Sequence, residues 1–207
     1  MKLNRRLLLL GAPLAAQLFY FPLNRFSQGG VTPNIFLDNL IPLRPAWALP
    51  YLLAIVWWCG SFLYAALKMD EPLFRMMIYN SVAVIFFSVF CYTLFPTYVI
   101  RPLLTETGGW WELLRWIYNH DGLYNALPSG HAYLSTLIAI YYSRWKPALI
   151  LPMVLWLMII IFSALFTHQH YILDLVAGSA LAGISALIAF LLLGQKSTSK
   201  RKISFVK

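Results

Sequence analysis

Charged residues are scarce in this chain: of its 207 residues only 11% are Asp, Glu, Lys or Arg, whereas 60% are hydrophobic. A soluble domain has about 25% charged residues and about 45–50% apolar ones, so this composition excludes a soluble globular domain. Cysteine is nearly absent as well. Cys59 and Cys91 both lie in apolar runs, which excludes the disulfide framework of a small secreted domain.

Acidic residues are scarcer than basic ones, and the 16 Lys and Arg against 7 Asp and Glu give a net charge of +9. Such a balance raises the question of a nucleic-acid partner. The basic residues, however, are scattered between the apolar runs and flank them, as membrane topology requires. We therefore expect a membrane bilayer as the partner, and no nucleic acid.

Six apolar runs predict an all-α, polytopic membrane helix bundle with about six transmembrane helices, since one crossing takes about 20 apolar residues. They cover residues 7–21, 46–67, 73–95, 131–142, 147–166 and 171–193. Residues 1–207 are expected to form a single integral membrane domain, with a basic tail at 194–207. The first run also resembles a signal peptide, but it continues past any cleavage point. The fourth run is short and partly polar, which predicts a helix surrounded by other helices.

The distribution of Lys and Arg between alternate connections predicts the orientation. Twelve fall on the side of both termini and four on the other side, so the positive-inside rule places the termini in the cytoplasm. The twelve are Lys2, Arg5, Arg6, Lys68, Arg75, Arg144, Lys146, Lys196, Lys200, Arg201, Lys202 and Lys207, and the four are Arg25, Arg44, Arg101 and Arg115.

The outer side carries the long connection 96–128 and the short turn 167–170. Trp110, Trp111 and Trp116 in the long connection predict a short amphipathic helix at the membrane interface. The chemically distinctive residues of the chain thus gather at the outer membrane face, which is periplasmic, extracellular or luminal according to the source membrane.

His170 and Asp174 are four residues apart at the start of the last run. On a helix this spacing puts both side chains on one face, where a carboxylate can hold one imidazole nitrogen. A buried Asp that merely takes a nearby His as its partner is the structural alternative. Ionisable residues inside a span are costly and usually mark functional sites, which favours a catalytic pair.

Pro128, Ser129, Gly130 and His131 precede or begin the fourth run, on the same side as His170. A hydroxyl and a free backbone N–H at a helix start form an anion site, although a simple helix cap has the same sequence. Arg101 follows the third run on this side; it is either an ordinary interfacial arginine or a clamp for a phosphate.

Taken in order, these motifs resemble the type 2 phosphatidic acid phosphatase superfamily, whose pattern is Lys-x6-Arg-Pro, Pro-Ser-Gly-His and Ser-Arg-x5-His-x3-Asp. The resemblance covers about residues 73–193. The matching residues are Arg101, Pro102, Pro128, Ser129, Gly130, His131, Ser163, His170 and Asp174. Leu94 stands at the position of the family's lysine and Ala164 at that of its second arginine.

The resemblance implies a membrane lipid phosphatase that hydrolyses a phosphate or diphosphate ester without a metal or other cofactor. His170 would form a phosphohistidine, Asp174 would orient its ring and His131 would protonate the leaving oxygen. The non-bridging oxygens of the lipid phosphate substrate would be bound by Arg101, Ser129 and Gly130.

The two departures bear on the substrate. A monoester phosphate carries about −1.5 to −2 charge near pH 7, and here only Arg101 remains of three cations. A phosphodiester needs less neutralisation, and the sphingomyelin and inositol phosphorylceramide synthase branches similarly lack the Ser-Arg pair, so headgroup transfer is the alternative. In favour of hydrolysis, the Arg-Pro and Pro-Ser-Gly-His motifs have the phosphatase form, and His168, Arg115 or His120 could replace the missing cations.

Two readings from other classes stay open. A metal-dependent hydrolase could use His120, His131, His168, His170 and Asp174 as ligands. A degenerate, non-catalytic lipid-binding protein would explain Leu94 and Ala164, but not the retention of costly intramembrane His and Asp.

Small residues recur along the last run, which predicts close helix packing either inside the bundle or in a homo-oligomer. They are Ala177, Gly178, Ala180, Ala182, Gly183 and Ala186.

Overall fold

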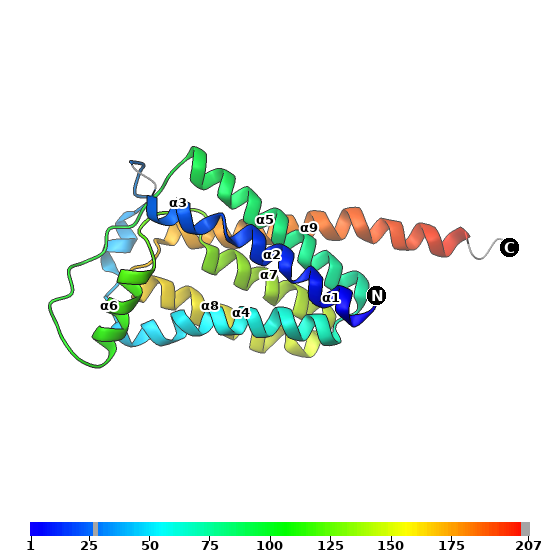
Figure 1. Cartoon of the computed structure of the whole chain (residues 1–207), viewed down its shortest axis with the longest axis horizontal. Helices are drawn as coiled ribbons and strands as arrows, with labels where there is room; N and C mark the ends of the chain where they lie inside the picture. The colour runs from blue at the N-terminus through cyan, green and yellow to red at the C-terminus, as the bar shows by residue number, and fades with distance from the viewer. Residues whose placement is uncertain (27–28, 204–207) are drawn as a thin grey trace.

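The computed structural model describes residues 1–26 and 29–203, with side chains as far as Leu192. It is a bundle of helices (Figure 1), which confirms the all-α class; the described part has only two isolated β-bridges and no strand. The helices are α1 (Leu3–Leu9), α2 (Gly11–Gln17), α3 (Tyr20–Phe26), α4 (Ala48–Lys68), α5 (Glu71–Leu94), α6 (Trp110–His120), α7 (Gly130–Trp145), α8 (Ile150–Phe166) and α9 (Ile172–Ile203), with short 3-10 turns η1 (Phe36–Leu40), η2 (Pro45–Trp47) and η3 (Pro147–Leu149).

Five helical segments of the described part are long and apolar enough to cross a membrane. They are Leu3–Phe26, Pro45–Lys68, Glu71–Leu94, Pro147–Phe166 and Ile172–Leu192. These five correspond to five of the six predicted runs, with ends that differ by a few residues. Their length and composition are those of an integral membrane protein.

The remaining run forms α7, which has 16 residues and lies at the centre of the bundle. It packs against α4, α5, α8 and α9, and ten of its residues are buried. A helix covered on all sides by other helices tolerates polar side chains, because these find partners inside the protein. The prediction that this run is surrounded by helices is confirmed.

The first run is longer than predicted and is broken into α1, α2 and α3. Pro22 has no N–H to bond the preceding turn, which accounts for the interruption near Leu18. The pieces pack against α4 and α5, and Arg6 donates to the carbonyl oxygens of Ala65, at 2.9 Å, and Met69.

The last helix, α9, continues to Ile203, ten residues beyond the predicted end of its run at 193. The basic tail predicted at 194–207 is helical in its backbone up to Ile203, while its side chains and residues 204–207 lie outside the described part. Within α9, Ala182 and Ala186 are fully buried and belong to the main apolar core, so part of the small-residue series packs inside the bundle.

The two ends of the bundle differ. The end that contains α6, η1 and the turn between α8 and α9 lies opposite the N-terminus and the far end of α9 (Figure 1). The predicted amphipathic helix is present as α6, which buries Leu114 and Ile117 and leaves Trp110 and Trp116 half exposed. The thiols of Cys59 and Cys91 are unpaired, as predicted.

Candidate active site

The Pro-Ser-Gly-His segment is fixed where α7 begins. Ser129 is the N-cap of α7, and its hydroxyl oxygen accepts a bond from the Ala132 N–H at 3.4 Å. The segment before it is held by the Leu127 N–H, which donates to Thr97 Oγ1 at 2.8 Å, and by the Tyr92 hydroxyl, which donates to the Pro128 carbonyl. The start of α7 is therefore anchored to α5 and to the long connection.

The same segment is joined directly to α9, because the Ser129 N–H donates to the backbone carbonyl of Asp174 at 3.0 Å. The approach is close: a Cβ atom added to Gly178 would lie 2.6 Å from the Ser129 carbonyl oxygen. Glycine at this position lets the two helices meet, and their meeting brings the second and third motifs together.

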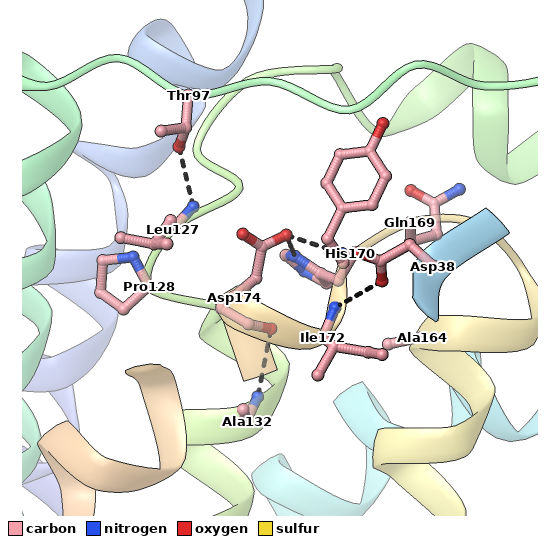
Figure 2. Close-up of polar contacts among 12 residues, drawn as sticks. Asp38, Thr97, Leu127, Pro128, Ala132, Ala164, Gln169, His170, Ile172 and Asp174 are labelled. Carbon is pink, nitrogen blue, oxygen red and sulfur yellow. Dashed lines mark hydrogen bonds and ion pairs between the residues drawn. The ribbon is translucent and has the colours of Figure 1, made fainter. Parts of the chain in front are cut away.

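The His170 and Asp174 side chains face each other at the start of α9 (Figure 2), with 3.4 Å between Nδ1 and Oδ2. The same Oδ2 accepts the Tyr171 N–H at 2.8 Å. Asp174 is completely buried, His170 is 9% exposed, and Asp174 Oδ1 has no partner among the described residues. With its Nδ1 toward the carboxylate, His170 has Nε2 available for another atom.

His131 lies across from this pair, with 5.9 Å between the centroids of the His131 and His170 rings. Tyr51 of α4 stacks on the His131 ring at 4.0 Å, and the Trp58 ring approaches it at 4.9 Å. The Nε2 atom of His131 is buried and has no partner in the described part of the chain. An unpaired buried nitrogen of this kind calls for a partner, such as a water molecule or a ligand.

Arg101 lies beside the cluster and is held by protein oxygens. Its Nη1 donates to the carbonyls of Tyr118, at 3.2 Å, and Asp121, at 2.9 Å. Its Nη2 donates to the Gly122 carbonyl at 2.7 Å and to the Gln169 side-chain oxygen. A guanidinium has five N–H groups. Four are used here, and the buried Nε has no partner in the described residues, so one N–H remains for a ligand.

Tyr118 connects α6 to the turn that carries His170. Its hydroxyl donates to the Thr167 carbonyl at 2.9 Å. Burial raises the pKa of Tyr118 to about 12, against a smaller lowering by the charge of Arg101. The phenol therefore keeps its proton, and this hydrogen bond, at any physiological pH.

The three candidate replacement cations have partners elsewhere. Arg115 pairs with Glu112 at 2.6 Å, His120 stacks on Trp116 at 4.2 Å, and the Nε2 of His168 bonds the Ile41 carbonyl at 3.1 Å. The missing cations are thus not replaced by free charges within the described cluster.

The two departures from the family pattern occupy different surroundings. Leu94, at the end of α5, is 53% exposed, whereas Ala164 is fully buried. The Ala164 carbonyl accepts the N–H groups of Gln169 and His170, at 3.0 and 3.3 Å, so this position supports the turn through its backbone.

The residues of the metal-site alternative do not form a ligand set. Among the described residues no three His, Cys, Asp or Glu side chains are grouped so that they could hold a metal ion. His120 in particular lies on α6 against Trp116.

Four residues near the site were not singled out from the sequence: Asp38, Tyr51, Trp58 and Gln169. Asp38 lies on η1, and its Oδ1 accepts the N–H of Ile172 at 2.9 Å, which caps α9 from far along the chain (Figure 2). With His168 and His170 it lines a small pocket. The sequence did contain a signal for Asp38, which is the first acidic residue of a chain that has few acidic residues. Tyr51 and Trp58 are aromatic residues in an apolar run, and nothing in the sequence marked them as parts of a site.

The site thus combines a buried His–Asp pair with a second histidine opposite it, inside an all-α membrane bundle. The chain belongs to the PAP2 superfamily, whose family model matches residues 34–188. The match extends further toward the N-terminus than the motifs do and includes both Asp38 and Tyr51. No curated protein and no solved structure matches the chain. Membership makes the chain a phosphatase-type lipid enzyme in general.

Proposed function

We propose that the chain is a membrane lipid phosphatase, which hydrolyses a phosphate or diphosphate ester through a phosphohistidine on His170 and needs no metal ion. The observation that carries this proposal is the buried His170–Asp174 pair, 3.4 Å between Nδ1 and Oδ2, with the His131 ring 5.9 Å from the His170 ring. The pair supplies an oriented nucleophile, and the opposite ring supplies a proton donor.

In the first step, His170 Nε2 attacks phosphorus while the bond from phosphorus to the leaving oxygen breaks. Asp174 holds the ring and stabilises the positive charge that develops on it. Protonated His131 gives its Nε2 proton to the leaving oxygen. In the second step, water attacks phosphorus, His131 takes a proton from it, and the nitrogen–phosphorus bond breaks to regenerate His170.

Hydrogen-bond donors stabilise the charge on the non-bridging oxygens. The free donors are the Nε–H of Arg101, the hydroxyl of Ser129 and the N–H of Gly130 in the first turn of α7. Donors aimed at charge that grows in the transition state lower the barrier, and helix starts attract anions.

A second function is favoured by one observation, the occupation of all four terminal N–H groups of Arg101 by protein oxygens. A cation with one free N–H suits the single charge of a phosphodiester better than a monoester dianion. The second candidate is therefore transfer of a phospho-headgroup from a phosphodiester lipid to an alcohol, through the same His170 intermediate.

The distribution of Lys and Arg supports an orientation with cytoplasmic termini and an active site at the outer face. The turn between α8 and α9 and the start of α7, which carry motif residues, lie at the bundle end opposite the N-terminus (Figure 1). In this orientation the half-exposed Trp110 and Trp116 of α6 lie at headgroup depth, where a lipid phosphate meets the site.

The test uses the full chain purified in detergent, with phosphatidic acid, a prenyl diphosphate and a phosphodiester phospholipid, each with and without an acceptor lipid and a chelator. Free phosphate and new lipid are measured together. Chelator-resistant phosphate release from a monoester or diphosphate supports the phosphatase, and new phospholipid without phosphate supports headgroup transfer. Rapid quenching with labelled substrate should trap an acid-labile phosphoprotein in the wild type and none in His170→Ala. Full activity of His170→Ala would refute both functions.

A further inference from the structure

The His131 ring is enclosed by aromatic side chains of α4. The Tyr51 ring lies 4.0 Å from it with only 23° between the planes, and the Trp58 ring lies 4.9 Å away at 55°. Trp58 is itself fixed, because its indole N–H donates to Ser135 Oγ, one turn along α7, at 3.0 Å. The plane of the imidazole is thus defined by packing against α4.

Tyr51 is fixed as firmly as the ring it covers. Its side chain is 3% exposed, and its hydroxyl donates to Asp121 Oδ2 at 2.8 Å. The backbone carbonyl of the same Asp121 accepts a bond from Arg101 Nη1 at 2.9 Å. Tyr51 therefore connects the ring of His131 with the residue that anchors Arg101.

We propose that Tyr51 is a positioning residue. Its ring orients His131 so that the Nε2 proton points toward the leaving oxygen, and its bond to Asp121 fixes the position of His131 relative to Arg101. The inference rests on the proposed function, in which His131 protonates the leaving group. Nε2 is buried and unpaired in the described part of the chain, so the orientation of this atom depends on what holds the plane of the ring.

The proposal makes a prediction that a purely structural role does not. A general acid matters when the leaving group is a poor one, such as an alkoxide, and matters little for an activated leaving group such as 4-nitrophenolate. Misalignment of the His131 ring should therefore slow the phosphorylation of His170, measured as kcat/KM, much more with an alkyl ester than with an aryl ester.

The experiment compares two phosphoesters that share one lipid chain and differ in the leaving group, an alkyl alcohol or 4-nitrophenol. The chain is purified in detergent as wild type, Tyr51→Leu, Tyr51→Phe and His131→Ala. The matched control is Tyr142→Leu, because Tyr142 is 5% exposed, lies on α7 far from His131 and donates its hydroxyl to the Ser61 carbonyl at 2.6 Å.

We expect Tyr51→Leu to lower kcat/KM, which reports the phosphorylation of His170, about 100-fold for the alkyl ester and less than about threefold for the aryl ester, as does His131→Ala, because a general acid contributes about 100-fold or more. Tyr51→Phe, which keeps the stacked ring but loses the bond to Asp121, should give a ratio of the two substrates between those of the wild type and Tyr51→Leu. Tyr142→Leu should leave the ratio of the two substrates unchanged.

An equal loss with both substrates in Tyr51→Leu, or no loss, would overturn the proposal. If Tyr51→Leu does not fold, Tyr51→Met and Asp121→Ala are judged by the same ratio. The outcome separates this inference from the proposed function: a leaving-group effect in His131→Ala but not in the Tyr51 variants refutes only the role of Tyr51, whereas a wild type that cleaves no phosphoester in the assays refutes the function.

Discussion

The two histidines of the site are held in different ways. His170 is oriented by polar contacts from its own stretch of chain: the Asp174 carboxylate lies 3.4 Å away and also binds the Tyr171 N–H. His131 is oriented by the rings of Tyr51 and Trp58, which belong to another helix.

This difference matches the proposed roles. A nucleophile that gains positive charge benefits from an adjacent carboxylate, which stabilises that charge. A proton donor must keep its donating nitrogen free of protein partners, so flat aromatic surfaces can fix its ring without occupying that nitrogen. A substitution that removes the polar contacts of His170 should therefore not disturb the orientation of His131, and a substitution of the aromatic residues around His131 should not disturb that of His170.

We expect the largest effect from Asp174→Asn, which removes the carboxylate that orients His170. An amide would present its N–H₂ to His170 or would lose the Tyr171 bond, and either way the ring would lose its orientation and charge support. Activity should fall about 100- to 10,000-fold, as for a histidine left in the wrong tautomer. The Ser129 bond to the Asp174 backbone remains, so the unfolding temperature should change little. Activity within threefold of the wild type would contradict the role of Asp174.

An intermediate effect is expected at the contact that joins the two histidines. Gly178→Ala puts a Cβ atom 2.6 Å from the Ser129 carbonyl oxygen and 3.0 Å from the Ala132 Cβ, so α7 must move away from α9. Overpacking of this kind costs about 1–3 kcal/mol, and the shift should also lower activity because His131 moves relative to His170.

The matched control for this change is Gly183→Ala on the same helix, where nothing lies within 4 Å of the added Cβ. Thermal unfolding and turnover of both variants in detergent check the prediction. Equal behaviour of the two variants would show that the close approach of α9 to Ser129 does not position the site.

The smallest effect is expected at Asp38, which supports His170 from outside its own segment. Asp38→Ala removes the acceptor for the N–H groups of Ile172, at 2.9 Å, and Ile35, at 2.8 Å. Loss of such a helix cap costs about 0.5–2 kcal/mol, with a smaller loss of activity than in either preceding variant.

Asp70→Ala is the control for Asp38, since Asp70 is the N-cap of α5 but its side chain makes no capping bond. Unfolding temperatures and turnover in detergent compare the two. If Asp38→Ala were as stable and active as Asp70→Ala, His170 would be supported only by polar contacts from its own stretch of chain.

Much of the fold follows from hydrophobic runs, because a bilayer imposes length and composition on each crossing. Residues 147–166 match the segment Pro147–Phe166, and the central place of α7 followed from its polar residues. Two features could not be predicted: the division of the first run into α1, α2 and α3, and the extension of α9 to Ile203. Helix ends and breaks depend on local hydrogen bonding, which the composition of a run does not specify.

The candidate site divides in the same way. The pairing of His170 with Asp174 was predicted from their spacing of four residues on a helix; the two side chains do pair, although His170 lies in the turn before α9, which begins at Ile172. The stack of Tyr51 on His131 could not be predicted, because an aromatic residue in an apolar run is compatible with any packing partner. The anchoring of Arg101 by carbonyl oxygens was equally hidden, since every residue has a carbonyl.

The sequence by itself determined the membrane bundle, the family and the identity of the motif residues, since these depend on runs and spacings along the chain. Only the tertiary structure decided how the histidine rings face each other, what fixes each of them and how many N–H groups Arg101 has free. These depend on contacts between segments far apart in the chain, whose geometry is set by the packing of α4, α7 and α9 and not by any one of them.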